Sequence, residues 1–278
     1  MGTGKKRKLH DGNYRNKAPA PKLAKPPQPT KPKPASESKK QKPPPVIEPT
    51  IPFDPNERIL LIGEGDLSFA RSCVEHHGCA ELTATTYDSE TELFEKYPQA
   101  RENAEYLVSE GQGVLHGVDA TKLTQKEIRK GQRWDRILFN FPHVGGKSKD
   151  VNRQVRYNQE LLVGFFRAAS PLLAPDGTIV VTLFEGEPYT LWNIRDLARH
   201  TGLEVQRSFK FQSEAYPGYA HARTLGNIEG GGGWKGETRP ARTYIFQAKV
   251  ERQARKRETP KKRKREQADK SDGEEGWD

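Results

Sequence analysis

Short apolar runs that end at glycine or aspartate divide the middle of the chain into predicted strands. Residues 59–62 (Ile-Leu-Leu-Ile) are apolar throughout, β-branched at both ends, and stop at Gly63. This pattern is typical of a parallel strand that is buried on both faces. Four later runs predict further strands, at residues 81–87, 114–118, 134–141 and 178–184.

The stretches between these strands predict helices. The first starts near residues 66–68 and runs to His77, where Gly78 is placed to cap it. Pro98 divides the helical stretch 90–110 into two pieces, because proline cannot continue a helix. Two more helices are predicted at residues 151–170 and 191–201, with residues 172–177 forming a turn before the strand at 178–184.

The last two predicted strands have no helix between them. They cover Leu203–Phe211 and Thr243–Val250 and form a hairpin. Alternating strands and helices that finish in a hairpin predict an α/β fold, with a mostly parallel sheet and an antiparallel C-terminal edge.

Charge and proline separate the ends of the chain from this middle. Residues 1–50 carry 13 Lys and Arg against 3 acids, together with 11 of the 21 prolines, and residues 251–278 carry 10 basic against 8 acidic residues. Residues 51–250 carry 24 basic and 26 acidic residues, so the net charge of +10 belongs to the ends. We expect a disordered basic Pro/Lys-rich tail at 1–50, one domain at 51–250, and a disordered charged tail at 251–278.

Composition also limits where the protein acts. No apolar run approaches the roughly 20 residues that span a bilayer, and the basic start at residues 5–8 is not followed by an apolar segment, so we expect no membrane span and no secretion. Two cysteines fit a reducing compartment. The basic clusters at 255–257 and 261–265 are typical of nuclear import or nucleic-acid contact, although a merely solvating tail is the alternative.

A glycine-containing turn follows the first predicted strand. Gly63-Glu64-Gly65-Asp66 lets the backbone approach a nucleotide at the start of the next helix. Ser68 stands where the dinucleotide pattern G-x-G-x-x-G has its third glycine. This difference favours a ligand without a diphosphate over NAD. A tight turn without a ligand is the alternative.

Acidic residues follow the next two predicted strands. Asp88 is placed to accept hydrogen bonds from both hydroxyls of a ribose, and Asp119 could face an adenine amino group. Each alone could be a solvated turn aspartate, but three ligand-type positions at consecutive strand ends favour one site.

The segment Asn140-Phe141-Pro142-His143 follows the fourth predicted strand. Asn140 could bond a base nitrogen, while Phe141 and His143 could stack on a base. Lys147 follows closely and could meet a phosphate. The alternative is an ordinary proline-containing loop.

A metal site is not expected. Cys73, His76, His77 and Cys79 lie within seven positions, mostly on one predicted helix, and no second pair of ligands has zinc-finger spacing. The two cysteines are expected to pack as small apolar groups.

Three separated segments resemble the fungal large-subunit (25S) ribosomal RNA uridine-N(3) methyltransferase family. They are Ile62–Ala70 (IGEGDLSFA), Phe139–Lys147 (FNFPHVGGK) and Tyr216–Thr224 (YPGYAHART), within a similarity that covers about residues 56–250. The resemblance implies a Rossmann-like class I methyltransferase fold, S-adenosylmethionine (SAM) as cofactor, methyl transfer to uridine N(3) of ribosomal RNA in pre-ribosomal particles, and residence in the nucleus and nucleolus. We also expect a monomer.

The resemblance also implies roles for individual residues. Those expected to hold SAM are Gly63, Glu64, Gly65, Asp66, Ser68, Asp88 and Asp119. Asn140, Phe141, Pro142 and His143 stand where amino-directed methyltransferases have Asn-Pro-Pro-aromatic, with Phe and His as departures. Lys147, Tyr219, His221 and Arg223 are expected to contact the RNA.

Uridine N(3) carries a proton at neutral pH, which a methyltransferase must remove or compensate. His143 is the expected acceptor, and Lys147 or backbone amides could support the carbonyl oxygens instead. Two alternatives remain open: a catalytically silent RNA-binding or ribosome-assembly protein of the same fold, and an NAD(P)-dependent oxidoreductase.

Overall fold

The computed structural model describes residues 48–129, 131, 133–222 and 236–249. The expected tails, apart from residues 48–50, and the predicted RNA contact Arg223 lie outside the described residues. None of the helices that the described residues form is long and apolar enough to cross a membrane.

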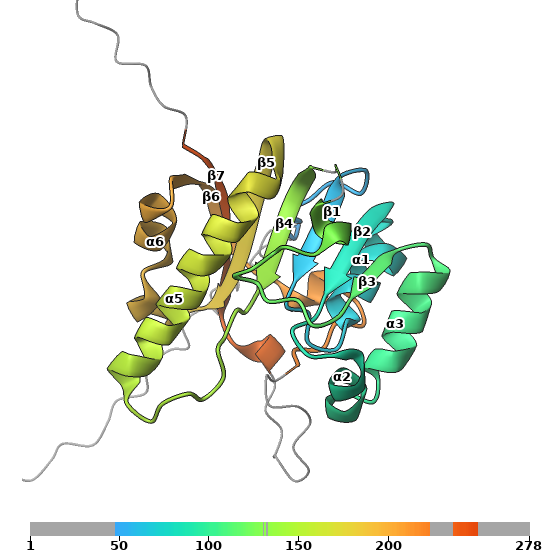
Figure 1. Ribbon diagram of the computed structural model, residues 1–278, viewed down its shortest axis with the longest axis horizontal. Helices are drawn as coiled ribbons and strands as arrows, with labels where there is room; N and C mark the ends of the chain where they lie inside the picture. Colours follow the sequence, from blue (N-terminus) through green and yellow to red (C-terminus); the bar gives the residue numbers. More distant parts are fainter. Residues whose placement is uncertain (1–47, 130, 132, 223–235, 250–278) are drawn as a thin grey trace, which may run out of the picture. The chain divides into compact units, whose positions relative to one another are not determined.

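Seven strands form one sheet in the order β3-β2-β1-β4-β5-β7-β6 (Figure 1). The strands β1 to β5 pair in parallel, and β7 lies antiparallel between β5 and β6. This arrangement confirms the predicted Rossmann-like class I methyltransferase fold with its antiparallel C-terminal pair. The strands are β1 Arg58–Ile62, β2 Glu81–Thr85, β3 Gly113–Leu115, β4 Trp134–Asn140, β5 Leu173–Phe184, β6 Leu203–Lys210 and β7 Ala241–Ala248.

Helices α1 to α3 lie beside β1 to β3, and α5 and α6 lie beside β5 to β7 (Figure 1). As predicted, Gly78 caps the first helix with φ 67°, and the stretch around Pro98 is broken into two helices. The helices are α1 Ser68–His77, α2 Glu90–Lys96, α3 Ala100–Ser109, α4 Lys126–Arg129, α5 Val151–Ala169 and α6 Ile194–His200. Short 3-10 turns cover Ser170–Leu172, Tyr189–Trp192, Ser213–Ala215 and Gly236–Thr238.

Alternate residues of the central strands belong to two different cores. In β1, Leu60 and Ile62 join the core that contains α5 and α6, whereas Ile59 and Leu61 join the core that contains α1 and α3. All four side chains are at most 1% exposed. Burial on both faces explains why this strand is a continuous apolar run in the sequence.

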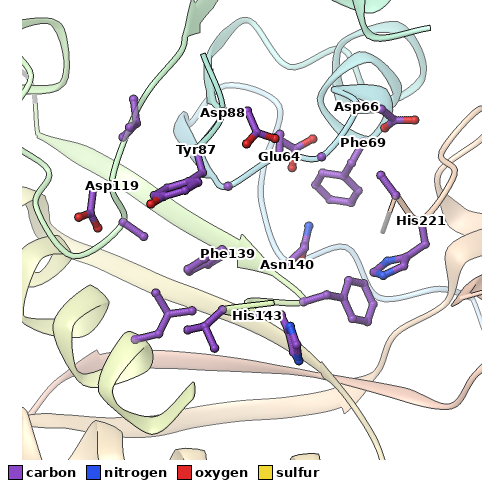
Figure 2. Close-up of a pocket in the computed structure, with 18 of the residues that line it drawn as sticks. Glu64, Asp66, Phe69, Tyr87, Asp88, Asp119, Phe139, Asn140, His143 and His221 are labelled. Carbon is purple, nitrogen blue, oxygen red and sulfur yellow. The ribbon is translucent and has the colours of Figure 1, made fainter. Parts of the chain in front are cut away.

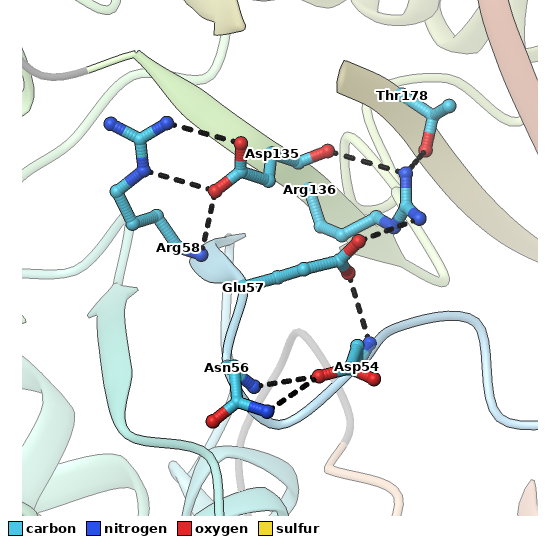
Figure 3. A network of polar contacts seen from close by, with 7 residues as sticks. All are labelled: Asp54, Asn56, Glu57, Arg58, Asp135, Arg136 and Thr178. Carbon is cyan, nitrogen blue, oxygen red and sulfur yellow. Dashed lines mark hydrogen bonds and ion pairs between the residues drawn. The ribbon is translucent and has the colours of Figure 1, made fainter. Parts of the chain in front are cut away.

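Ion pairs connect the amino ends of the central strands (Figure 3). Arg58 binds both carboxylate oxygens of Asp135, at 2.9 and 3.1 Å, and lowers the pKa of that carboxyl group. Arg136 contacts Glu57 at 2.8 Å and the Thr178 hydroxyl at 2.8 Å. These contacts fix the edge opposite the carboxyl ends of the strands, where open parallel sheets bind their ligands.

Several predicted element boundaries were wrong. Residues 173–177, predicted as part of a turn, lie within β5, and a Cβ on Gly177 would stand only 2.6 Å from the Trp134 carbonyl oxygen. The helix predicted at 191–201 starts at Ile194, because Asn193 has φ 52° and interrupts it. Strands β2 and β3 end two or three residues early, so Asp88 and Asp119 lie on loops beyond them.

Candidate active site

A cavity of about 500 Å³ opens at the carboxyl ends of β1, β2 and β4 (Figure 2). It brings together twelve of the residues predicted from the sequence: Gly63, Glu64, Gly65, Asp66, Asp88, Asp119, Asn140, Phe141, His143, Lys147, Tyr219 and His221. Ser68 and Pro142 are buried next to it and do not line it.

Both glycines of the turn after β1 are sterically required. Gly63 has φ 65°, and a Cβ there would lie 2.6 Å from the ring of Phe139. A Cβ on Gly65 would lie 2.6 Å from the Cβ of Ala222. The turn therefore follows the cavity wall closely, and a distant segment of the chain packs directly on it.

The carboxylates of this turn cap the helix that follows. Glu64 Oε2 accepts the Ala70 amide proton at 3.2 Å, and Asp66 Oδ1 accepts the Ser68 amide proton at 3.1 Å. Burial raises the pKa of Glu64 to about 8, and the charge of Asp66 adds to this rise, whereas the Ala70 amide opposes it. Two amides that could hold a phosphate at the start of α1 are thus already bonded to acids.

This arrangement fits SAM better than a dinucleotide. A pyrophosphate would replace or repel the two carboxylates, whereas SAM brings a sulfonium and an ammonium group, both of them cations. The buried acids Glu64 and Asp66 lie at the cavity wall where such cations would be attracted. The charge of the turn therefore argues against the NAD(P) alternative.

Asp88 faces the cavity from the loop after β2 and is paired with Lys96. Lys96 Nζ lies 2.6 Å from Asp88 Oδ1, and both side chains line the cavity. Tyr87, which the sequence analysis did not single out, is 73% exposed and lies between Asp88 and Asp119 in Figure 2. An exposed aromatic side chain next to a strand end was the signal that could have identified it, because such a ring can stack on a base.

Asp119 is held in place by its own turn. Its Oδ1 accepts the amide proton and the hydroxyl proton of Thr121, at 2.8 and 2.7 Å. Partial burial raises the pKa of Asp119, but the two bonds from Thr121 and the nearby Lys122 together outweigh burial, and the net pKa is lowered. The side chain therefore stays an anion that can accept a hydrogen bond from a ligand.

Asn140 is the end of β4 and has an unusual side chain. Its Nδ2 is buried and has no hydrogen-bond partner among the described residues, and the amide points into the cavity (Figure 2). A buried donor without a partner costs about 1–3 kcal/mol, which a ligand acceptor could recover. Next to it, Phe141 has φ 49°, which holds the chain in a sharp turn as its amide bonds the Thr182 carbonyl at 2.8 Å.

His143 is tied to the backbone of its own loop. The Gly145 amide donates to His143 Nδ1 at 2.9 Å, so the neutral ring carries its proton on Nε2. Burial lowers the pKa of His143, which keeps the ring neutral. The ring lies 6.1 Å from that of Trp192 and points away from Glu64 and Asn140 (Figure 2). In this geometry His143 is a hydrogen-bond donor, and accepting a proton at Nδ1 would require loss of the Gly145 bond.

The predicted RNA contacts lie at the cavity rim. Lys147 Nζ lies 5.9 Å from the ring centre of Tyr157. Tyr219 Oη and His221 Nδ1 are 3.0 Å apart, and the His221 ring meets the Phe141 ring edge to face at 4.5 Å. The rim therefore combines a cation with several aromatic rings, a common arrangement for single-stranded RNA.

Cys73 and Cys79 are buried in the core beside α1, as expected for small apolar groups. Within the described part of the chain, no three His, Cys, Asp or Glu side chains gather as a metal site would require.

Sequence comparison finds related proteins across eukaryotes. The BMT5-like family, described as rRNA (uridine-N3-)-methyltransferase, matches residues 60–223. A 25S rRNA (uridine(2634)-N(3))-methyltransferase of Saccharomyces cerevisiae is 34% identical over 76% of this chain and 79% of its own length. Heavy metal-associated isoprenylated plant protein 41 of Arabidopsis thaliana is 38% identical over 62% of this chain and 34% of its own length.

Solved structures that match the chain in a structural comparison include methyltransferases. A methyltransferase from Pyrococcus furiosus has a TM-score of 0.42 and 21% identity, with 69% of this chain and 76% of that chain covered. TrmN from Thermus thermophilus has a TM-score of 0.43 and 19% identity, with 70% and 45% covered.

Proposed function

The chain belongs to the BMT5-like rRNA (uridine-N3-)-methyltransferase family, and on that premise we propose that it transfers a methyl group from SAM to N(3) of a uridine in large-subunit ribosomal RNA. The unpartnered amide of Asn140, at the wall of a cavity lined by acids, is the observation that supports this most directly. It marks the position where a base with an acceptor oxygen would complete the hydrogen bonds.

The acidic half of the cavity would hold SAM. When bound, SAM supplies a methyl group activated by a sulfonium sulfur. Asp66 would place negative charge at the glycine turn, and Glu64 would add to it by losing its proton as the cationic SAM binds. Asp88 would bind the ribose, and Tyr87 and Asp119 would contact the adenine. Asp88 would exchange its bond with Lys96 for the ribose hydroxyls or share it with them.

The other half of the cavity would hold the uracil ring. Uracil N(3) lies between two carbonyl groups, and Asn140 Nδ2 could donate to one of them. That bond becomes stronger as negative charge develops on the imide, so Asn140 would stabilise the reacting form more than the resting base. Phe141 and the rings at the rim provide surfaces on which a base removed from its stack could lie.

The same function suggests where the protein works. We propose that it acts as a monomer on pre-ribosomal particles in the nucleus and nucleolus. The basic clusters at 255–257 and 261–265 support nuclear import and RNA contact.

Methylation of unmodified large-subunit ribosomal RNA tests the proposal. Purified protein is incubated with SAM and an in vitro transcript, and the digested nucleosides are analysed by mass spectrometry. We expect N(3)-methyluridine, and we expect Asn140→Ala to lose it while still binding SAM. A protein that binds SAM and RNA without forming the product would be the silent RNA-binding alternative, and one that binds NAD in preference to SAM would be the oxidoreductase.

A further inference from the structure

The position of His221 raises a second candidate for the proton of N(3). His221 and Asn140 line the same cavity, whereas the ring of His143 points away from Asn140 (Figure 2). The His221 ring packs edge to face on Phe141 at 4.5 Å and lies 5.2 Å from Phe184. Two aromatic contacts thus hold the plane of this imidazole in the cavity that Asn140 also lines.

Tyr219 orients the same ring. Its hydroxyl lies 3.0 Å from His221 Nδ1. When Nδ1 carries the proton and donates it to the Tyr219 oxygen, the basic lone pair is on Nε2. A base that is oriented by a third group is the usual arrangement in sites that transfer protons. His143 has the opposite arrangement, since its Nδ1 accepts from Gly145 and its proton is on Nε2.

The His221 segment is also fixed to the cofactor side of the cavity. Ser68, in the first turn of α1, bonds both backbone groups of Ala220. The Cβ of Ala222 fills the space above Gly65 so closely that no side chain could stand there. His221 therefore lies between one residue bonded to the start of α1 and one packed on the glycine turn, so it is held on the side of the cavity where SAM is expected.

We propose that His221, rather than His143, accepts the N(3) proton of the target uridine, with Tyr219 as its positioning residue; this inference rests on the proposed function. The N(3)–H bond breaks as its proton passes to His221 Nε2. The electron pair left on N(3) then forms a bond to the methyl carbon, and the carbon–sulfur bond breaks with its electrons going to sulfur. N(3)-methyluridine and S-adenosylhomocysteine result, and the imidazolium returns its proton to water.

Two described titratable or charged side chains lie around the rings that His221 contacts. The Tyr219 hydroxyl lies against His221 itself. The guanidinium of Arg239 lies over Phe184 at 4.3 Å and over Tyr189 at 5.4 Å.

The test measures single-turnover methylation of the large-subunit transcript against pH, with full-length variants. His221→Asn keeps an amide near the Nδ1 position and removes Nε2. We expect it to lose about 10²- to 10⁴-fold near neutral pH, to regain much of this in alkaline buffer, where uridine ionises unaided, and to respond to added imidazole. Tyr219→Phe should reduce the methylation rate less than His221→Asn does and should shift its pH profile. His143→Asn should change the rate, if at all, by the same factor at every pH.

Two controls separate this proposal from the proposed function. His76→Asn alters an exposed histidine on α1 and should match the wild type, and all variants must retain the wild-type melting temperature and SAM affinity. If wild-type protein forms no N(3)-methyluridine, the proposed function fails and this inference fails with it. If the wild type is active and His221→Asn stays close to it at neutral pH, or if only His143→Asn is rescued by alkaline buffer, His221 is not the acceptor.

Discussion

The hydroxyl of Ser68 donates to the carbonyl oxygen of Ala220 at 3.2 Å and accepts the amide proton of Ala220 at 3.1 Å. One side chain thus satisfies both backbone groups of a residue 152 positions away in the chain. The bond pair joins the start of α1, next to the glycine turn, to the segment that carries Tyr219 and His221. The proposed cofactor site and the proposed RNA contacts are therefore joined directly by one pair of hydrogen bonds.

Ser68→Ala should loosen this joint. Because two backbone groups lose their partner, we expect a loss of about 1–3 kcal/mol in the free energy of unfolding, together with a raised KM for RNA. Urea denaturation and methylation kinetics measure the two effects. Ser109→Ala removes an exposed hydroxyl that bonds only the Tyr106 carbonyl, so it should cost much less. Equal losses for both variants would show that the Ala220 bonds contribute little.

Asp88→Ala should weaken SAM binding by a factor of roughly 10 or more, because a contact between a carboxylate and the ribose hydroxyls is worth about 1.5–3 kcal/mol. Calorimetry measures the affinity. Lys96→Met removes the partner that Asp88 has in the structure and leaves the carboxylate, so it should change the affinity far less. Unchanged affinity in Asp88→Ala would exclude Asp88 from the ribose site.

The parts of this fold that depend on local pattern could be predicted. Residues 59–62 are apolar because both faces of β1 are buried. Gly63 and Asp88 could be predicted to share one cavity because the carboxyl ends of parallel strands lie at the same edge of the sheet. The order of strands and helices then predicts the sheet without knowledge of any contact.

Contacts between distant residues could not be predicted from local pattern. The bonds between the Ser68 hydroxyl and Ala220 were not predicted, and contact of Ser68 with the cofactor stays a prediction. His143 was expected to accept a proton, but the Gly145 amide occupies its Nδ1. Both hydrogen bonds depend on the folded geometry, which cannot be predicted from the residue types alone. Tyr87 was missed for a related reason, since the early end of β2 at Thr85 exposes it.

The charged ends of the chain should control the salt dependence of RNA binding. Residues 51–250 sum to −2, whereas residues 1–50 and 251–278 sum to +10 and +2. Removal of both ends should flatten the plot of log affinity against log salt concentration, because fewer counterions are released, and should leave SAM affinity intact. A variant with the same end residues in scrambled order should keep the slope. A truncated protein that binds RNA with the full slope would place the basic surface elsewhere.

Glu64 should make the stability of the ligand-free protein fall as pH rises. Its pKa is raised by burial from 4.5 to about 8, so between these two pH values the folded protein binds a proton that the unfolded chain has lost. The free energy of unfolding then decreases by up to about 1.4 kcal/mol per pH unit in this window, and the decrease ends above the folded pKa. Glu64→Gln keeps an oxygen for the Ala70 amide and cannot ionise. The free energy of unfolding of the variant should therefore rise relative to that of the wild type from pH 5 to 8.

Glu92→Gln is a control whose effect on stability should change with pH in the opposite direction. Glu92 accepts bonds from the Ser89 amide and hydroxyl, which lower its pKa, so its contribution is present above the unfolded pKa and is lost as the pH falls. Urea denaturation across the pH range should therefore give difference curves of opposite slope for the two variants. Because SAM brings positive charge toward Glu64, its binding at pH 7 should also release a proton, which calorimetry in buffers of different ionisation enthalpy detects. A flat difference curve for Glu64→Gln, with no proton release in the wild type, would mean that this carboxyl group is already ionised in the empty protein.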